Sequence, residues 1–475
     1  MPWPVTQRLY NGIIFPVQGP NLDNIEKVDL GALPMIHRMA SCGLQVDLNH
    51  FAKMEKKLDD DLDRLTEDVY TMTGHRVNLD SGDQVSDLLF KKMGLKQARR
   101  VFTKSGDRES VENEVLVAIQ HEHPVVSLIL EYKEVSKLNG TYVKPMPKLA
   151  RRTQFGKWRM YPNFGTTRIP SGRLNCKEPN LLAMPNRTER GREVCEGFIT
   201  DDGWVYLSVD ESQIEPRVVA HRSHDKNLMN VYLNEEDIYS DFAIAAFRIP
   251  DKRYKDPVKG WVYPDVDKKK QRFPAKTCVL ASIYEVTAKG LVEQLPVVCS
   301  TCFVEAKDHL KSNCPKFTAL WQEDNTQRTL INPFYQRYPG IIDMRRMDHS
   351  RARKHGYCWD EWGRILHCTA TKSVHKWVVS AALREAGNFP IQSTAQGTVK
   401  ITMARVDDDF VKLGVYGDCY NPLLQIHDEL LGECRKDVAE EIGYLISSRF
   451  EECVKLDVPI KAGTAMAENW GLLPK

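Results

Sequence analysis

The 475-residue sequence contains no apolar run that approaches the roughly 18 residues of a membrane-spanning helix. Its first residues, Met1-Pro2-Trp3-Pro4, lack the basic segment and apolar core of a secretory signal. The sequence has no internal repeat, no phosphate-binding glycine loop ending in Lys-Ser/Thr and no His-Glu-x-x-His helix. These absences argue against membrane proteins, repeat arrays, P-loop enzymes and the common zinc proteases.

The sequence also lacks an excess of charge of one sign, because its formal net charge is only +2. Its 12 cysteines are scattered along a long chain without a targeting signal, which is typical of reduced thiols and not of a disulfide framework. We therefore expect a cytoplasmic protein. Hydrophobic content of 42% and charged content of 27% indicate a folded globular chain, and its length predicts more than one lobe.

Basic residues are nevertheless concentrated between Lys148 and Arg192, where lysine and arginine far outnumber the only two acids, Glu178 and Glu189. Charge alone favours a solvated, loop-rich surface over a phosphate-binding surface. The choice between these two interpretations depends on other motifs.

Apolar spacing predicts helices in the first third of the chain. From Asn49 to Thr73, apolar residues recur every three or four positions, and Gly74 follows as a stop signal. Similar patterns predict helices over residues 84–93 and 112–137. The N-terminal third is therefore expected to be mainly helical.

Two predicted strand ends carry acidic residues. The segment from Gly203 to Asp210 alternates apolar and other residues, which predicts a half-buried strand ending at Asp210. Near the C-terminus, two apolar runs flank His427, Asp428 and Glu429, which predicts a hairpin with acids at its tight connection. Each acid alone is most often a turn residue. Together they fit a two-magnesium site for nucleotidyl transfer, because Mg²⁺ prefers hard oxygen ligands on rigid neighbouring elements.

Four motifs resemble those of family A (polymerase I-like) DNA polymerases and occur in the same order. The first is Asp210-Glu-Ser-Gln-Ile-Glu-Pro-Arg217, and the last is His427-Asp428-Glu429. Between them lie Arg272-x-x-x-Lys276-x-x-x-Leu280-x-x-x-Tyr284, similar to the family's fingers helix, and Asn388-Phe-Pro-Ile-Gln-Ser-Thr-Ala395. The resemblance extends on both sides through Lys137-Leu-Asn-Gly-Thr-Tyr142, Gly172-Arg-Leu174, Pro179-Asn-Leu181 and Gly463 to Trp470. It covers nearly the whole chain.

This resemblance implies an α+β fold, the right-hand polymerase fold, with a helical thumb, an antiparallel-sheet palm and helical fingers. The implied division is an N-terminal segment with the start of the palm (1–48), the thumb (49–150), the palm with the first catalytic aspartate (151–235), the fingers (236–375) with a Cys-containing insertion near 295–332, and the palm with the second catalytic aspartate (376–475).

The resemblance also implies roles for individual residues. Asp210 and Asp428 are the expected ligands of two Mg²⁺ ions, for which Mn²⁺ can substitute, and the backbone carbonyl of Glu211 joins them. Glu429 and Lys276 complete the expected catalytic residues, as an auxiliary acid near the primer end and a candidate proton donor to pyrophosphate. Nucleotide contacts are expected from Glu211, Gln213, Glu215, Tyr239, Arg272, Lys276, Leu280 and Tyr284. DNA contacts are expected from Lys137, Arg173, Asn180, Arg187, Gln392 and His427.

Helix geometry supports part of this assignment. Residues four apart lie on one helix face, so Arg272, Lys276 and Tyr284 can line a triphosphate over about three turns. Without the flanking motifs, an ordinary basic turn followed by core residues is the alternative. Glu215 resembles the family's sugar gate, which excludes a ribose hydroxyl and so favours deoxynucleotides.

Several positions depart from the family pattern. Leu280 stands where an aromatic residue is usual, and Glu285 stands where glycine commonly follows the tyrosine. Tyr239 replaces a usual histidine, and Pro216 interrupts the usual run between the acid and the arginine. None of these changes affects the expected metal ligands.

Four potential metal ligands form a separate cluster in the expected insertion. Cys299, Cys302, His309 and Cys314 are ligand types that suit zinc. Their spacing, Cys-x2-Cys-x6-His-x4-Cys, departs from common zinc knuckles, and packed reduced thiols are the alternative.

The implied function is template-directed extension of a primer 3′-OH with dNTPs on primer-template DNA. The short stretch before the polymerase-like region has no Asp-x-Glu exonuclease signature, so we expect any proofreading or helicase activity to come from a separate partner. A compact form with an insertion fits a replicative phage or viral polymerase acting in the host cytoplasm or nucleoid.

Three alternatives stay open at this point. A repair or lesion-bypass polymerase has the same chemistry, and a single-subunit RNA polymerase or a reverse transcriptase has the same fold. The alternative from another class is a non-catalytic replication scaffold. The joint presence of Asp210, Lys276 and Asp428 argues against a scaffold.

Overall fold

The computed structural model describes residues 16–17, 19–96, 101–103, 106, 109–312 and 314–474. Most of the N-terminal segment predicted over 1–48 is included, but its first 15 residues lie outside the described part. The chain divides into two compact units. Unit 1 comprises Met1–Asp47, Leu149–Val286 and Thr329–Lys475, and unit 2 comprises Leu48–Lys148 and Thr287–Arg328. No helix among the described residues is long and apolar enough to cross a membrane.

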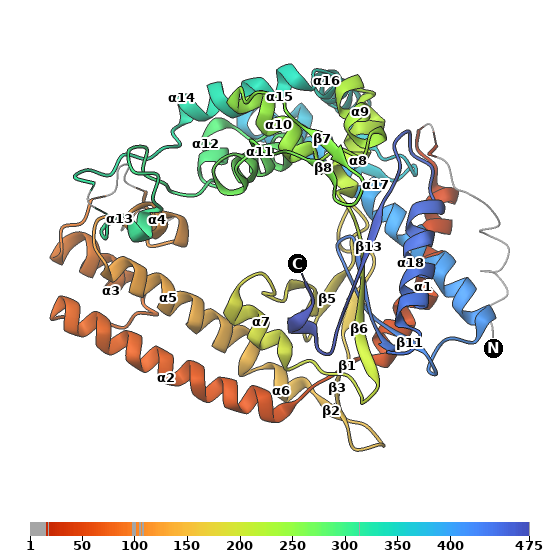
Figure 1. Ribbon diagram of the computed structural model, residues 1–475, viewed down its shortest axis with the longest axis horizontal. Helices are drawn as coiled ribbons and strands as arrows, with labels where there is room; N and C mark the ends of the chain where they lie inside the picture. Colours follow the sequence, from red (N-terminus) through yellow and green to blue (C-terminus); the bar gives the residue numbers. More distant parts are fainter. Residues whose placement is uncertain are drawn as a thin grey trace. The chain divides into compact units, whose positions relative to one another are not determined.

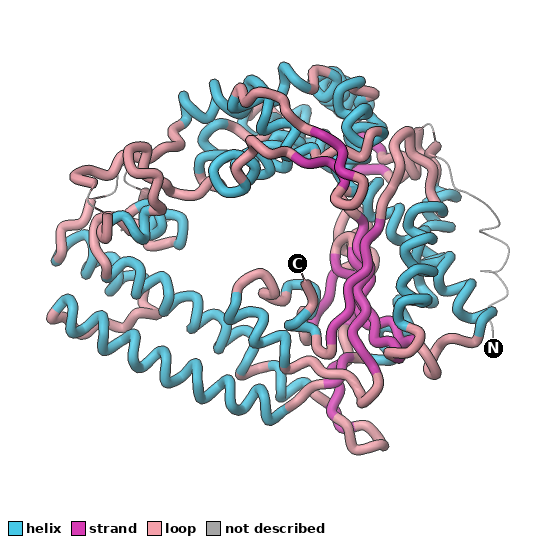
Figure 2. Tube along the Cα trace, viewed as in Figure 1, coloured by secondary structure: helices cyan, strands magenta, loops and turns pink. Residues whose placement is uncertain are grey.

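Unit 2 is built from helices and loops (Figure 2). Its helices and helical turns are α2 (Leu48–Thr73), α3 (Gly82–Ser86), η2 (Asp87–Lys92), α4 (Asn113–Ala118), α5 (Val125–Leu138), η3 (Asn139–Val143), α6 (Met146–Leu149, at the boundary), α12 (Ala288–Val292), α13 (Ala306–His309) and α14 (Glu323–Thr326). Helix α2 packs along α5 and buries Phe51, Met54, Leu58, Leu65 and Val69. The helix predicted over Asn49–Thr73 is confirmed.

The single helix predicted over 112–137 is wrong, because two helices, α4 and α5, share that region. The chain leaves α4 after Ala118 and begins α5 only after Pro124. Proline has no N–H to donate and disfavours helical geometry in the residue before it, so it favours a helix start. The segment predicted to be helical over 84–93 is helical, but most of it, Asp87–Lys92, has the wider π-helical form.

Unit 1 contains most of the strands and the longest helix. Its helices and helical turns are α1 (Leu22–Cys42), η4 (Leu181–Ala183), α7 (Glu189–Glu196), α8 (Ile214–Ser223), α9 (Lys226–Leu233), α10 (Ile238–Phe247), η5 (Lys268–Arg272), α11 (Phe273–Ile283), η6 (Gln327–Ile331, at the boundary), α15 (Asn332–Arg337), α16 (Gly340–His355), η7 (Thr369–Lys372), α17 (Lys376–Leu413), α18 (Ala439–Glu452) and η8 (Trp470–Leu472). Its strands are β1 (Leu44–Gln45), β2 (Arg151–Arg152), β3 (Trp158–Met160), β4 (Asn163–Gly165), β5 (Asn175–Lys177), β6 (Trp204–Glu211), β7 (Tyr254–Asp256), β8 (Gly260–Val262), β9 (Tyr357–Trp359), β10 (Ile365–His367), β11 (Tyr420–Ile426), β12 (Glu429–Arg435) and β13 (Ala462–Ala467).

A four-stranded antiparallel sheet, in the order β11-β12-β6-β13, is the centre of unit 1. Helices α1, α17 and α18 cover one face of it (Figure 1). Their apolar side chains, among them Met39, Met403 and Phe450, pack with Leu207 of β6 into one core. Complete burial of a large apolar side chain contributes about 1.5 to 3 kcal/mol, so this interface holds the sheet rigidly.

Strand β6 is buried more completely than its sequence pattern predicts. The alternating residues Val205, Leu207 and Val209 are buried, as expected, but Tyr206 and Ser208 on the opposite face are buried too. The half-buried strand predicted over 203–210 is therefore a central strand covered on both faces. The predicted hairpin is confirmed as β11 and β12, joined at His427 and Asp428.

The predicted fingers helix begins earlier than its motif. A π-helical turn, η5, leads directly into α11, so helical backbone runs from Lys268 to Ile283. Pro274 lies in the first turn of α11, just after the π-helical turn. Tyr284 is the first residue beyond the helix.

The segment predicted as an insertion near 295–332 lies mostly in unit 2. Its short helix α13 packs against α4. The unit 2 part of this region, Thr287–Arg328, is preceded by Val286 and followed by Thr329, which both belong to unit 1.

Candidate active site

Strand pairing brings the two predicted catalytic aspartates to the same end of the central sheet. Asp210 is the penultimate residue of β6 and lies opposite Glu429, the first residue of β12. The Glu211 amide donates a hydrogen bond to the Asp428 carbonyl, with an N···O distance of 3.1 Å. The connection before β12 is tight, and His427 has a left-handed φ of 57°. A non-glycine residue in that region carries strain, which is common at functional sites.

Two carboxyl groups at this sheet end, those of Glu211 and Asp428, have raised pKa values. Burial raises the pKa of Glu211 well above its usual range, and the neighbouring Asp428 and Asp210 raise it further. Burial also raises the pKa of Asp428, and Glu215 and Glu429 add to the effect while His427 opposes it. Crowded carboxylates of this kind favour a bound cation, which would relieve their repulsion.

The donors present fit Mg²⁺. Asp210 and Asp428 offer hard carboxylate oxygens from a rigid strand and its neighbouring turn, which is what this ion prefers. Both side-chain oxygens of Glu211 are buried and make no hydrogen bond within the described part of the chain. The Ser208 hydroxyl donates to Glu429 at 2.6 Å and so orients the Glu429 carboxylate.

Glu215 lies at the centre of a second cluster. It accepts hydrogen bonds from Arg173, at 2.6 Å, and from the Tyr284 hydroxyl. Burial raises the pKa of Tyr284 above its usual range, and the Glu215 carboxylate raises it further, whereas a hydrogen bond from Gln392 opposes the shift. Four residues expected to contact the nucleotide or the DNA are therefore linked to one another.

The turn that precedes Glu215 is held by Arg217. Its guanidinium donates to the carbonyls of Ser212 and Pro459 and lies 4.6 Å from the Tyr232 ring centroid. The Tyr232 hydroxyl donates to the Gln213 side chain at 3.2 Å, and Gln213 has left-handed backbone angles before α8. Pro216 falls in the first turn of α8, where N–H groups have no intrahelical partner, so it does not disrupt the helix.

The basic residues of the fingers helix face Tyr239 of α10. Arg272 and Lys276 lie 5.2 Å and 5.5 Å from the centroid of the Tyr239 ring. Arg272 also makes two hydrogen bonds to Asp237, at 2.8 Å and 3.1 Å. Lys276 is exposed, and Leu280, one turn further along, is half-buried.

Comparison with known proteins decides the family. The sequence matches DNA polymerase family A over residues 48–472. The chain belongs to this family.

Two curated relatives illustrate the likeness. The chain is 29% identical to a thermostable DNA polymerase I of Thermus filiformis over 98% of its own length and 50% of that protein. It is also 29% identical to DNA polymerase I of Deinococcus radiodurans, over 94% of its own length and 42% of that protein. It therefore spans about half the length of the curated relatives that it matches.

Among solved structures, a POL domain of Pol1 from M. smegmatis, in complex with DNA primer-template and dNTP, is similar to the chain. The match covers 93% of this chain and 70% of the POL-domain chain. The sequence identity is 26% and the TM-score is 0.77. The α+β polymerase fold predicted from the sequence is confirmed.

Among the remaining expected DNA contacts of this family A chain, His427 directly precedes Asp428 in the tight connection of the first cluster. Asn180, Arg187 and His427 are exposed, and Lys137 is an exposed residue on α5 of unit 2. The basic stretch 148–192 is not uniformly free to bind phosphate. Arg159 is largely buried and makes two hydrogen bonds to Glu433, at 2.7 Å and 2.8 Å, so it joins β3 to β12.

Sequence patterns missed two residues that contact predicted site residues. The Ser208 hydroxyl donates to Glu429, and the Asp237 carboxylate accepts from Arg272. Asp237 carries a signal that could have indicated its position, because it caps α10 by accepting from the Ser240 amide. Glu285, one of the departures from the family pattern, lies 3.3 Å from His349 of α16.

Proposed function

We propose that this family A chain is a template-directed DNA polymerase, which extends a primer 3′-OH with deoxynucleoside triphosphates. The observation that carries the proposal is the pairing of β6 with β12, which brings Asp210 and Asp428 to one sheet end in a chain of this family. The complex of the similar POL domain with primer-template and dNTP supports the same substrates.

Asp210 and Asp428, with the backbone carbonyl of Glu211, are the ligands we assign to two Mg²⁺ ions, for which Mn²⁺ can substitute. When bound, such ions lower the pKa of the primer hydroxyl and neutralise the developing phosphoryl charge. Glu429 adds negative charge beside the metal ligands, and Ser208 orients it.

The chain's other residues bind and orient the nucleotide. Arg272 and Lys276 neutralise the triphosphate, and the exposed Lys276 ammonium is the proton donor we assign to the leaving pyrophosphate. Glu215, oriented by Arg173 and Tyr284, excludes a ribose hydroxyl. Lys137, Asn180, Arg187, Gln392 and His427 are the further residues we assign to DNA.

Primer extension with purified full chain tests the proposal. A labelled DNA primer on a DNA template is supplied with Mg²⁺ and one dNTP at a time, and we expect addition only of the complementary nucleotide. Absence of extension, or addition that ignores the template, would overturn the proposal. Parallel reactions with an RNA template and with ribonucleotides test the alternatives of a reverse transcriptase and an RNA polymerase.

The biological setting is a finer proposal. The Cys-containing insertion favours a replicative role in a phage or virus, although the relatives named above are bacterial. Repair or lesion bypass is the alternative. Extension past a single abasic site at the rate seen on undamaged template would favour lesion bypass over replication.

A further inference from the structure

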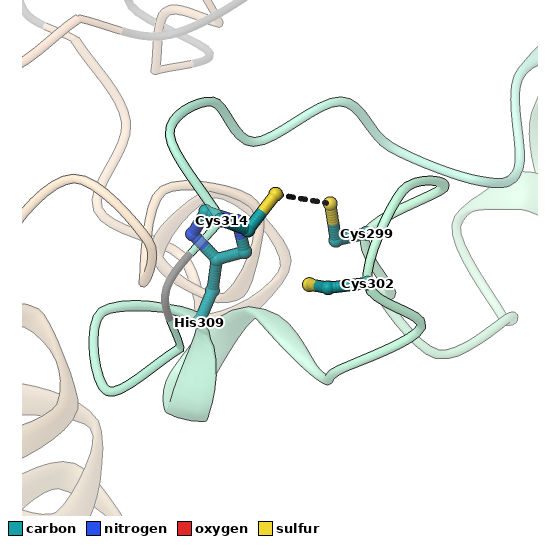
Figure 3. Close-up of side chains that lie close together, drawn as sticks. All are labelled: Cys299, Cys302, His309 and Cys314. Carbon is teal, nitrogen blue, oxygen red and sulfur yellow. Dashed lines mark hydrogen bonds between the residues drawn. The ribbon is translucent and has the colours of Figure 1, made fainter.

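Four side chains in the segment 287–328 of unit 2 converge on one point, away from the catalytic carboxylates in the sequence. Cys299, Cys302, His309 and Cys314 each offer a ligand atom, and these atoms all lie within 4.8 Å of one another (Figure 3). The cysteine thiols are not joined in disulfides. We propose that these four residues bind one structural Zn²⁺ ion, and that the metal-bound segment is fastened to the helices of unit 2 through Phe317 and His121.

The distances suit a single tetrahedral ion. Zinc–sulfur bonds of about 2.3 Å at tetrahedral angles separate two sulfurs by about 3.8 Å. The Cys299 and Cys314 sulfurs lie 3.9 Å apart, far beyond the roughly 2.05 Å of a disulfide. Three thiolates and one imidazole form a closed ligand set, which is typical of structural zinc, and a multi-iron cluster needs more room.

The histidine supplies an independent indication of a ligand. His309 is the last residue of the short helix α13, and it is only 6% exposed. Its Nε2 atom is buried and has no hydrogen-bond partner among the described residues. A buried polar nitrogen without a partner is destabilising, and a bond to the metal would remove that cost.

The backbone around the two first cysteines is already closed into a tight turn. The Cys299 amide donates to the Val304 carbonyl at 2.9 Å, and the Phe303 amide donates to the Cys299 carbonyl at 3.0 Å. Phe303 has a left-handed φ of 57°, which is unfavourable for a bulky side chain. The turn holds Cys299 and Cys302 on one side of the cluster.

Aromatic contacts connect the cluster to the helices of unit 2. The His309 ring meets the Phe317 ring edge to face, with 5.0 Å between centroids. On Phe317, the His121 ring is stacked, with centroids 3.9 Å apart and an interplanar angle of 18°. His121 lies in the connection between α4 and α5, and α13 packs against α4. A metal that fixes His309 therefore also fixes the surface on which Phe317 rests.

The segment that carries the cluster also connects the two units covalently. Val286 and Thr329, which flank the segment 287–328, belong to unit 1, so the chain leaves that unit and returns to it through this segment. Unit 2 is also joined to unit 1 at Asp47 and Leu149. The two ends of the metal-bound segment are thus a second pair of covalent connections between the units.

Metal analysis of the purified full chain tests zinc binding. After dialysis against metal-free buffer with reductant, we expect about one zinc per chain in the wild type and in Cys419→Ser, a control cysteine outside the cluster. Cys302→Ser and Cys314→Ser should lose most of it. Zinc near zero in the wild type, a Cys299–Cys314 disulfide found by mass spectrometry, or wild-type zinc content in both variants would overturn the site.

A spectroscopic measurement on the unmutated chain avoids the risk that a variant misfolds. Co²⁺ exchanged into the wild type should show thiolate-to-metal charge transfer and the strong visible bands of tetrahedral cobalt. Only the weak bands of six-coordinate cobalt would contradict the proposed ligand set.

Limited proteolysis tests whether Phe317 and His121 hold the metal-bound segment to the helices of unit 2. Trypsin sites at Lys307, Lys311 and Lys316 lie between Cys299 and Phe317 in the sequence. Phe317→Ala should keep its zinc but be cleaved at these sites at least several-fold faster than the wild type. The matched control Leu310→Ala, an exposed apolar residue of the same segment, should be cleaved like the wild type. Equal rates for Phe317→Ala and the wild type would remove the fastening role.

Discussion

Glu215 is held by two donors that differ in charge and geometry. The Arg173 guanidinium donates to one carboxylate oxygen and the Tyr284 hydroxyl to the other. A carboxylate held from both sides cannot rotate away from a nucleotide without breaking a charge-assisted hydrogen bond. This rigidity suits a residue whose assigned role is to exclude one hydroxyl group by its position.

The Glu215→Ala variant tests that role. Removal of the carboxylate opens space beside the nucleotide sugar, so we expect the ratio of ribonucleotide to deoxynucleotide incorporation to rise roughly tenfold or more. Steady-state incorporation of matched rNTP and dNTP pairs measures it. Glu440→Ala, an exposed acid of α18, is the control. An unchanged ratio in Glu215→Ala would defeat the assignment.

Lys276 is exposed beside the Tyr239 ring, with no ion pair to a carboxylate among the described residues. If it protonates pyrophosphate, Lys276→Ala should lower kcat by about 10²- to 10⁴-fold, as loss of a general acid does. Primer-template affinity should change little. Single-turnover incorporation and a binding titration separate the two effects, with Lys269→Ala as the control. A normal kcat with a raised KM would assign Lys276 to binding alone.

At the scale of elements, a buried ion pair joins α8 to α16. Arg222 makes two hydrogen bonds to Asp348, at 2.9 Å and 3.1 Å, and one to Glu361, at 2.8 Å. Burial opposes the charged form of Arg222, but the two carboxylates outweigh it and raise its pKa. Since α8 also carries Glu215, this pair helps to fix the helix that bears the proposed sugar gate.

The Asp348→Ala variant should leave the buried Arg222 charge with Glu361 as its only carboxylate. We expect the free energy of unfolding to fall by about 3 kcal/mol, because a buried charge that loses its partner is strongly destabilising. Denaturant titration measures the change. Asp343→Ala removes an exposed acid from the same helix and should cost little. Equal stability of the two variants would show that the pair contributes nothing.

Local patterns predicted the elements unevenly. The helix of Leu48–Thr73 and the β11–β12 hairpin follow directly from apolar spacing, because each buries one face in a regular register. Apolar spacing predicts one helix across Pro124, although proline itself is a local signal for the break. Burial of Tyr206 and Ser208 was not readable, because the cover on the second face of a strand comes from residues distant in sequence.

The site residues divide in the same way. Asp210, Asp428 and Glu215 were found through family motifs, since strand-end acids alone are ordinary turn residues. Asp237 and Ser208 were missed because their roles depend on partners in other elements, Arg272 and Glu429. The roles assigned to the individual residues stay predictions until variants are measured.

At the scale of the whole molecule, copying any template requires affinity without sequence information. Contacts to phosphate supply such affinity and make it salt-dependent, because each neutralised phosphate releases counterions. Exposed Lys137 on α5 is the unit 2 residue assigned to this work.

Lys137→Ala should weaken binding to all primer-templates alike. The slope of log affinity against log salt concentration should flatten by about 1, as expected for the loss of one phosphate contact. Fluorescence anisotropy over a salt series measures it, with the exposed Lys455 as the control position. A slope equal to that of the wild type would exclude a phosphate contact at Lys137.

The arrangement of the chain into units was only partly predictable. Family motifs predicted helices over 49–150, and Leu48–Lys148 does form a helical unit. The packing of Thr287–Arg328 with that unit was not foreseen. It includes the stacking of His121 on Phe317, which lie far apart in sequence and carry no mutual signal.

The central claim is that Asp210 and Asp428 together hold the metals for nucleotide addition. The most direct test is single-nucleotide incorporation on a DNA primer-template by the wild type and by Asp428→Asn, with Asp437→Asn as an exposed control. We expect wild-type rates in the control. The Asp428→Asn rate should fall on the order of 10³-fold or more, because loss of a metal ligand removes several kcal/mol of transition-state stabilisation. Equal rates for Asp428→Asn and the wild type would contradict the account.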